Sequence, residues 1–186
     1  MLLDFKNLDD STRYKVMSNT IIPRPIAWIV TEDNGILNAA PFSYFAPLSS
    51  NPAVVVVSIG KKDDKTPKDT LANILKNKKA TICFVNSDNL EDMKLTANPL
   101  DKDRSEISTY NIKTRKIIEE YPPMISSSES ALFCDFHSKI ELNGKTTPII
   151  LEIKKQFVLD ESISKNYHIS LNNIARCGSG YKKLLE

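Results

Sequence analysis

The sequence is poor in the residues from which disulfide frameworks and metal centres are built. Its three cysteines, Cys83, Cys134 and Cys177, are odd in number and far apart, which indicates neither a disulfide framework nor a paired-cysteine zinc site. Its two histidines, His137 and His168, are also far apart along the chain. We therefore expect three reduced thiols with packing roles, and no metal site.

Long apolar runs and a marked excess of one charge are missing as well. No uncharged stretch is long enough to cross a bilayer, and residues 1–6 lack the basic and apolar segments of an export signal. The 25 basic and 23 acidic side chains leave a net charge of +2, far from the imbalance typical of nucleic-acid binders. We expect a cytoplasmic protein with no membrane or nucleic-acid partner. The length predicts a single domain, residues 1–186, around one core.

Several catalytic signatures are also missing. The sequence contains no Gly-x-Ser-x-Gly, no Walker phosphate loop, no His-Glu-x-x-His and no Rossmann glycine pattern, so the hydrolase, nucleotide triphosphatase and metalloprotease classes lack their characteristic parts. The spacing of the carboxylates and lysines selects no pair for acid–base work. We therefore assign no catalytic side chain and expect a cofactor to carry any chemistry.

Three short apolar runs are present, at residues 26–30, 53–57 and 80–85, and all are rich in β-branched side chains. Runs of this kind predict strands that are covered on both faces. Helical signals are few in comparison. The sequence therefore predicts a mainly β, barrel-like domain with a few peripheral helices.

Residues 132–142 alternate between apolar and polar side chains. The alternation predicts a half-exposed strand, with Leu132 on the inner face and with Phe133 and His137 on the outer face. Asn143-Gly144-Lys145 then turns the chain into a partner strand.

The clearest helical signal is the segment KTPKDTLANILKNKK. Thr66 is suited to cap the helix, Pro67 to occupy its first position and Asp69 to turn back toward the cap, ahead of an apolar stripe. A second, weaker helix is predicted over residues 89–97. Residues 99–115 are polar and are expected to form an excursion around the core.

A lysine-rich segment links the second apolar run to the predicted helix. Lys61, Lys62 and Lys65 follow the strand, and Lys68 lies near the helix start. Free N–H groups at a helix start, with hydroxyl and ammonium groups nearby, are what a phosphate dianion prefers. The segment predicts a phosphate site, and a solvated basic loop before an ordinary helix is the alternative.

The stretch TEDNGILNAAPFSYFAP, residues 31–47, combines a hairpin turn at Asn34-Gly35 with small and almost uncharged residues. The small side chains and missing N–H of Ala39-Ala40-Pro41 leave a smooth strip along which a flat heterocycle could lie. Backbone amides over residues 38–43 are candidate donors to the edge of such a ring. The alternative is an ordinary strand bent by its proline. The strip and the lysine-rich segment together indicate a ligand with a planar ring and a phosphate.

The segment IIPRPIAWIVTEDNGILNAAPFSYFAPLSSNPAVVVVSIG, followed by KDTLANI, resembles the flavin reductase-like, FMN-binding split-barrel family, including its flavoredoxin type. The resemblance is strong over residues 13–86 and looser over residues 131–157 and the C-terminal segment. It implies a split β-barrel of Greek-key type that forms a homodimer, with one FMN per subunit near the interface. It also implies an NAD(P)H-dependent flavin oxidoreductase, in which NADH or NADPH exchanges hydride with the flavin and a small molecule or redox protein accepts the electrons.

By position, the resemblance implies two groups of cofactor-binding residues. Those expected at the ring and ribityl chain are Arg24, Trp28, Thr31, Asn38, Ala39, Ala40 and Ser43. Those expected at the phosphate are Ser58, Gly60, Lys68, Asp69 and Thr70. Arg176 and Tyr181 flank a Gly-Ser-Gly turn and are expected to cover the flavin, with a frayed terminus as the alternative.

Two other functions are compatible with the sequence. The first is an electron-transfer protein that holds FMN tightly and has no efficient reaction with NAD(P)H. The second is a small β-barrel binding module without flavin, in which residues 61–70 form only a basic loop. No dedicated basic contact for a 2′-phosphate can be located, so NADH and NADPH both stay open.

Overall fold

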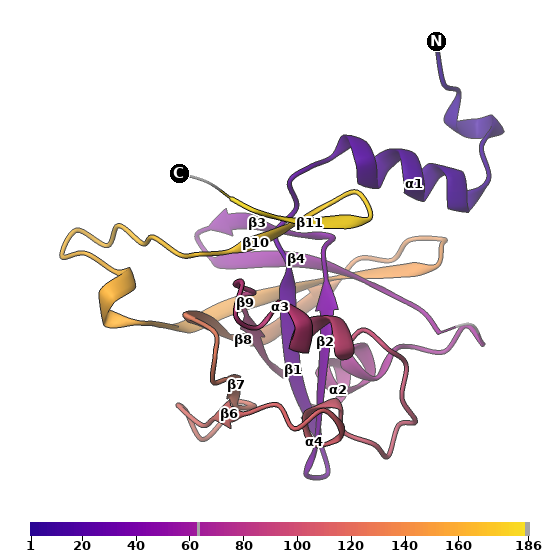
Figure 1. Ribbon diagram of the computed structural model, residues 1–186. Helices are drawn as coiled ribbons and strands as arrows, with labels where there is room; N and C mark the ends of the chain where they lie inside the picture. The colour runs from indigo at the N-terminus through magenta and orange to yellow at the C-terminus, as the bar shows by residue number, and fades with distance from the viewer. Residues whose placement is uncertain (63, 185–186) are drawn as a thin grey trace.

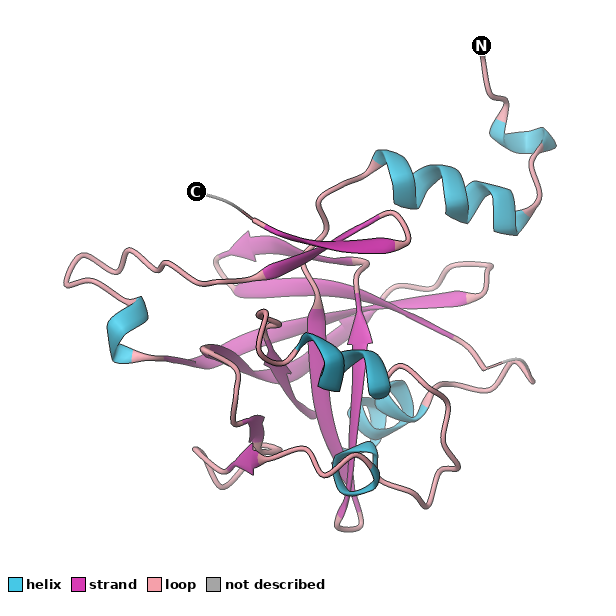
Figure 2. Cartoon of the chain, viewed as in Figure 1, coloured by secondary structure: helices cyan, strands magenta, loops and turns pink. Residues whose placement is uncertain are grey.

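The structure is a computed structural model that describes residues 1–62 and 64–184. Its helices are α1 (Asp10–Thr20), α2 (Asp69–Asn77), α3 (Leu90–Leu95) and α4 (Glu106–Thr109), with short 3-10 turns η1 (Phe5–Asn7) and η2 (Asp160–Ser162). Its strands are β1 (Ala27–Asp33), β2 (Ile36–Phe42), β3 (Phe45–Ser50), β4 (Ala53–Gly60), β5 (Lys79–Cys83), β6 (Thr114–Arg115), β7 (Met124–Ile125), β8 (Ser130–Lys139), β9 (Thr146–Val158), β10 (Ile174–Cys177) and β11 (Gly180–Lys183). Strands dominate the body of the molecule (Figures 1 and 2), so the expected mainly β class is confirmed.

The main sheet is antiparallel and curls into a barrel. Its seven strands follow the order β2-β1-β5-β8-β9-β4-β3. The two edge strands come back together, because Phe42 at the end of β2 and Phe45 at the start of β3 pack into the same interior cluster. Curling protects the unpaired edges that an open sheet would expose.

The barrel interior is filled by alternate residues of the strands. Ile29 of β1, Val57 of β4 and Ile82 of β5 are each fully buried there. Helix α2 joins this cluster through Leu71 and Ile74. Burial of such aliphatic side chains contributes roughly 1.5–3 kcal/mol each, so this cluster is a main source of stability.

A second apolar cluster covers the outer face of β1 and β5. Trp28, Val30 and Cys83 point to this side and pack with Met93 of α3 and Met124 of β7. Both faces of these strands are therefore covered, as the unbroken apolar runs predicted. The segment that supplies the outer cover includes the polar excursion at residues 99–115, which contains α4 and β6.

The course of β8 differs in part from the predicted alternation. His137 is exposed as expected, but Phe133, predicted to lie on the outer face with His137, is buried against the ring of Tyr121 at a centroid distance of 5.7 Å. The register with β9 shifts after Phe133 and again after Phe136, and the regular strand ends at Lys139. Leu132 and Cys134 lie in the barrel interior, so Phe133 between them is on the outer face as predicted, and the covering segment around Tyr121 buries it there.

The helices also depart from the prediction at their starts. Helix α2 begins at Asp69 with Lys68 as its N-cap, so the assignment of Thr66 as the cap is wrong. The Thr66 hydroxyl instead donates to the carboxylate of Asp64 in the preceding loop, at 2.5 Å. Helix α1 was not predicted from the sequence, although Asp9 caps it by accepting a 2.9 Å bond from the Thr12 N–H. None of the described helices is both long and apolar enough to cross a membrane.

Candidate functional site

A pocket of about 580 Å³ opens beside β2, the loop before α2 and the segment after α3. Its volume lies in the range of small-molecule and cofactor sites. The residues that line it are Asn38, Ala40, Lys61, Lys62, Asp64, Lys68, Asp69, Thr70, Thr96, Ala97, Asn98, Pro99, Leu100 and Glu106. The uncharged strip and the lysine-rich loop thus meet in one pocket, which neighbouring side chains leave open.

Positive charge gathers where the loop joins α2. Lys68 is exposed at the N-cap of α2 and makes no side-chain cap bond, and it makes no ion pair within residues 1–62 and 64–184. Lys62, in contrast, is held by Asp69 through a 2.9 Å ion pair. The pairing neutralises Asp69, whose charge would otherwise repel an anion. An unpaired lysine beside the first-turn N–H groups of a helix suits a phosphate.

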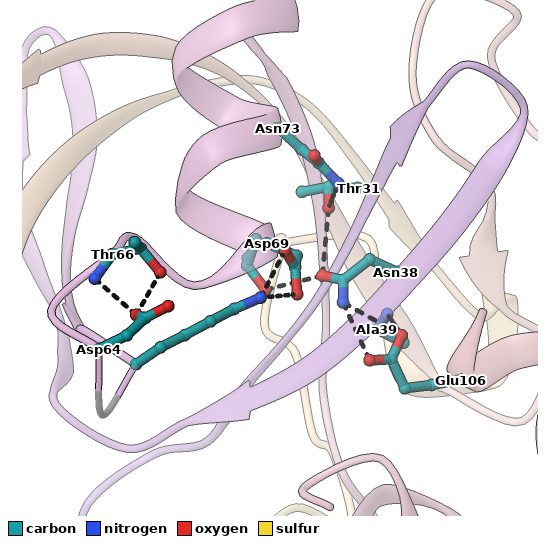
Figure 3. A network of polar contacts seen from close by, with 10 residues as sticks. Thr31, Asn38, Ala39, Asp64, Thr66, Asp69, Asn73 and Glu106 are labelled. Atoms are coloured by element: carbon teal, nitrogen blue, oxygen red, sulfur yellow. Dashed lines mark hydrogen bonds and ion pairs between the residues drawn. The ribbon is translucent and has the colours of Figure 1, made fainter. Parts of the chain in front are cut away.

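A buried polar network joins β2 to α2, and Figure 3 shows Asn38 at its centre. The amide oxygen of Asn38 accepts hydrogen bonds from the hydroxyls of Thr70, at 2.7 Å, and Thr31, at 3.3 Å. Thr31 in turn accepts from the Asn73 amide at 3.1 Å. We call Thr31, Asn38, Thr70, Asn73 and Glu106 the β2–α2 network. Its threonine and asparagine side chains hold one another, so they position the pocket wall and leave few groups free for a ligand.

Glu106 of α4 completes the β2–α2 network from the other side of β2 (Figure 3). Its two carboxylate oxygens each accept from the Asn38 amide nitrogen at 3.1 Å, and one also accepts from the backbone N–H of Ala39 at 3.1 Å. Burial raises the pKa of the Glu106 carboxyl, although these donors oppose the rise. The Ala39 N–H is therefore already bonded within the protein, which removes it from the candidate donors expected along residues 38–43.

Sequence reasoning did not find Glu106. The residue lies in the polar stretch after α3, where nothing marks one carboxylate out from its neighbours. The signal in hindsight is Ser105, which caps α4 by accepting from the Ser108 N–H and also donates to the Leu37 carbonyl of β2 at 2.6 Å. A serine before Glu-Ile predicts a short helix, but not the strand on which that helix docks.

Two residues expected at the phosphate lie elsewhere. Ser58 and Gly60 belong to the β4 backbone that pairs with β9, and neither lines the 580 Å³ pocket. The N–H of Ser58 donates to the Tyr44 carbonyl at 2.8 Å. The phosphate roles of Ser58 and Gly60 stay predictions, whereas Lys68, Asp69 and Thr70 lie on the pocket wall as expected.

Arg24 and Trp28 are both buried. Trp28 is completely buried in the outer cluster, and its indole N–H donates to the Thr96 hydroxyl at 3.0 Å, so it reaches the pocket only through Thr96. One terminal nitrogen of Arg24 donates to the carbonyls of Ser18 and Ile21, and its guanidinium lies 5.7 Å from the centre of the Tyr44 ring. Neither side chain lines the 580 Å³ pocket, and their expected place beside a flavin stays a prediction.

A smaller pocket of about 200 Å³ adjoins the first through Ala97. Ser43, Arg176 and Tyr181 line it, and the Arg176 guanidinium lies 4.4 Å from the centre of the Tyr181 ring. The β10–β11 hairpin therefore brings these expected residues together beside the strip, and it is ordered by pairing between Arg176 and Tyr181 rather than frayed. His168 and Cys177 line neither pocket.

Comparison with known proteins identifies the family to which this arrangement corresponds. The family model for a flavin reductase like domain matches residues 17–170. The chain belongs to the flavin reductase-like family. One relative, an uncharacterized protein of Aquifex aeolicus, is 29% identical over 182 residues, which are 95% of this chain and 91% of that protein.

Solved structures agree on the fold. Nitrilotriacetate monooxygenase component B from Bacillus cereus superposes with a TM-score of 0.93 at 24% identity, covering 100% of this chain and 96% of that chain. The 2-nitrobenzoate 2-nitroreductase NbaA of Pseudomonas fluorescens gives a TM-score of 0.89 at 21% identity, covering 98% and 91%. Identities this low show the fold alone, and they confirm the split barrel expected for a flavin reductase-like chain.

The pocket fits the flavin that the flavin reductase-like family implies. Its wall offers the small side chain of Ala40 and an unpaired lysine, Lys68, at a helix start. No group of three or more histidine, cysteine, aspartate or glutamate residues in the described part of the chain could hold a metal ion. The unpaired Lys68 at the helix start therefore suits the anionic end of such a ligand.

Proposed function

We propose that the chain is an FMN-binding oxidoreductase that exchanges hydride between NADH or NADPH and the flavin. The observation that carries the proposal is the single pocket in which the edge of β2 meets Lys61, Lys62, Lys68 and the start of α2. Membership of the flavin reductase-like family supports flavin as the ligand. The lysines and helix start support a flavin with a terminal phosphate, which FMN has and riboflavin lacks.

In this proposal the residues of the pocket bind and orient and do not react. Lys68 and the first-turn N–H groups of α2 hold the phosphate, while Asp69 keeps Lys62 in place. The small side chain of Ala40 lets a flat ring approach the strand, and residues 96–100 line the pocket across from the loop and exclude water. A bound flavin supplies the hydride chemistry, so the pocket wall needs no general base.

We also propose that two copies of the chain associate. Large apolar side chains are exposed on α1 and β3, among them Tyr14 at 58%, Ile21 at 58% and Leu48 at 54% of their surface. Figure 1 shows α1 projecting beyond the barrel on the side of β3 and the β10–β11 hairpin. A second copy would cover these side chains. Light scattering should give twice the 20.9 kDa of one chain, and a monomer would refute the association.

One experiment tests the proposed function. The visible spectrum of the purified protein is recorded with and without added FMN, and NADH or NADPH is then added without oxygen. Binding of FMN followed by rapid bleaching supports the proposal. Binding without bleaching, and without steady-state oxidation of either nicotinamide, indicates an electron-transfer protein instead. Failure to bind FMN indicates a binding module without flavin and shows that the proposal is wrong.

A further inference from the structure

Glu106 places a buried negative charge on the wall of the pocket. Its side chain lines both the 580 Å³ pocket and an adjoining pocket of about 230 Å³, and only 7% of the residue's surface is exposed. All three of its hydrogen bonds come from neutral donors, Asn38 and Ala39. The carboxylate form keeps all of these bonds, since both of its oxygens accept.

Lys102 and Arg104 line the adjoining pocket together with Glu106, but neither forms an ion pair with its carboxylate. Glu106 makes no ion pair among residues 1–62 and 64–184, in contrast to Asp69, which also lines the pocket and is paired with Lys62. A charge in a low-dielectric wall acts on a second charge far more strongly than one surrounded by water. Glu106 therefore penalises any negative charge that develops on the part of a ligand that lies against this wall.

A flavin changes its charge in this way when it is reduced. Hydride transfer from a reduced nicotinamide to the neutral oxidised ring delivers two electrons and one proton, and it yields the oxidised nicotinamide and an anionic reduced ring with no other proton needed. The phosphate carries the same charge in both forms. A carboxylate near the ring therefore changes the binding affinity for the two redox forms by different amounts. Lysines at the phosphate change both affinities equally.

Resting on the proposed function, we propose that Glu106 weakens the binding of reduced flavin relative to oxidised flavin, so that the chain passes on reduced flavin readily. The ratio of the two dissociation constants sets the midpoint potential of the bound flavin. A tenfold change in that ratio corresponds to about 30 mV for a two-electron couple. The wild type should accordingly bind oxidised FMN more tightly than reduced FMN, and its bound flavin should have a lower potential than free FMN.

The test compares dissociation constants for oxidised FMN and for chemically reduced FMN without oxygen, together with the midpoint potential of the bound flavin. Glu106→Gln removes the charge and keeps one acceptor for the Ala39 N–H, and it should favour reduced FMN about tenfold and raise the potential by about 30 mV. Glu106→Asp keeps the charge and should stay close to the wild-type ratio. Asp103→Asn is the matched control, because Asp103 lines the adjoining pocket but is exposed, and its ratio should change less than twofold.

Several results would overturn the inference. An equal change of both dissociation constants in Glu106→Gln is the result of a purely structural role and overturns it. An effect of Asp103→Asn as large as that of Glu106→Gln overturns it as well. If Glu106→Gln fails to fold, the two dissociation constants of the wild type test the inference. A wild type that binds reduced FMN as tightly as oxidised FMN, or more tightly, refutes it. A wild type that binds FMN in neither form overturns the proposed function together with the inference, whereas binding of oxidised FMN without discrimination overturns the inference alone.

Discussion

Replacing Lys68 with glutamate should weaken FMN binding strongly while leaving the fold intact. Lys68 lies on the pocket wall at the N-cap of α2, is exposed and makes no ion pair in the described chain. An acidic residue at a helix N-terminus interacts favourably with the helix dipole, so the substitution should not destabilise α2. Any loss of affinity can then be attributed to the contact with the phosphate.

The magnitude follows from two contributions. Loss of one charge-assisted hydrogen bond costs about 1.5 kcal/mol at an exposed site such as that of Lys68, the lower end of the range for charged partners. Repulsion between the new carboxylate and the phosphate adds about 1 kcal/mol in a largely aqueous setting. The sum of about 2.5 kcal/mol corresponds to a dissociation constant raised roughly 60-fold, and the neutral Lys68→Gln should raise it roughly tenfold.

The assay is a titration of FMN and of riboflavin, monitored by flavin fluorescence, for the wild type and both variants. Riboflavin has no phosphate, so its affinity should be unchanged in Lys68→Glu. Lys65→Glu is the control variant, because Lys65 is exposed in the same loop but does not line the pocket, and it should change FMN affinity less than threefold. Unchanged FMN affinity in Lys68→Glu, or an equal loss for riboflavin, would refute the placement of the phosphate.

Three further predictions follow from the described contacts. Thr70→Val removes the shortest hydrogen bond of the β2–α2 network and should lower the free energy of unfolding by about 1–2 kcal/mol in urea denaturation. Burial raises the pKa of Cys83 and of Cys134 to about 12, so only the half-buried Cys177 should react with a thiol reagent in the native protein, and all three cysteines after denaturation. His137→Ala should leave FMN affinity unchanged, because the imidazole is exposed and bonds only the next side chain along the chain.

The barrel could be predicted from the sequence because its strands carry a simple signal. Strands β1, β4 and β5 have apolar side chains on both faces, and the structure covers both faces of β1 and β5 with separate clusters. Such strands are apolar along most of their length, so the pattern is visible without knowing what packs on them. The meeting of the strip and the lysine-rich loop was inferred from the chemistry of a ligand, and one pocket does contain both.

Elements that depend on distant contacts could not be predicted in this way. Helix α1 has few apolar side chains and no stripe, and its start is marked only by Asp9. The burial of Phe133 results from the covering segment, whose Tyr121 ring packs against it. Local sequence does not show what packs on either element, so periodicity gives the outer face but not the burial of Phe133, and no helix for residues 10–20.

The start of α2 shows how an error of a few residues alters the chemistry. The sequence indicated a helix capped by Thr66, with free N–H groups at its start. The structure engages Thr66 with Asp64 and starts the helix at Asp69, where Lys68 provides no side-chain cap. The first-turn N–H groups therefore have no competing side-chain cap bond, and Lys68, Asp69 and Thr70 at this helix start line the pocket. This arrangement favours an anion more than the predicted one did.

Lys68 and Glu106 are two charged residues of the pocket without an ion pair in the described chain, and they differ in their exposure, so salt should separate their effects. Lys68 is exposed, so its attraction for the phosphate is screened over a Debye length of about 10 Å at 0.1 M ionic strength. Glu106 is buried, so its effect on the ring is screened much less. Raising the salt from 0.05 M to 0.5 M should therefore weaken the binding of oxidised and reduced FMN together while leaving the ratio of their dissociation constants nearly constant. A ratio that moves toward one as salt rises would show that the discrimination comes from exposed charges, and Glu106 would then have no special role.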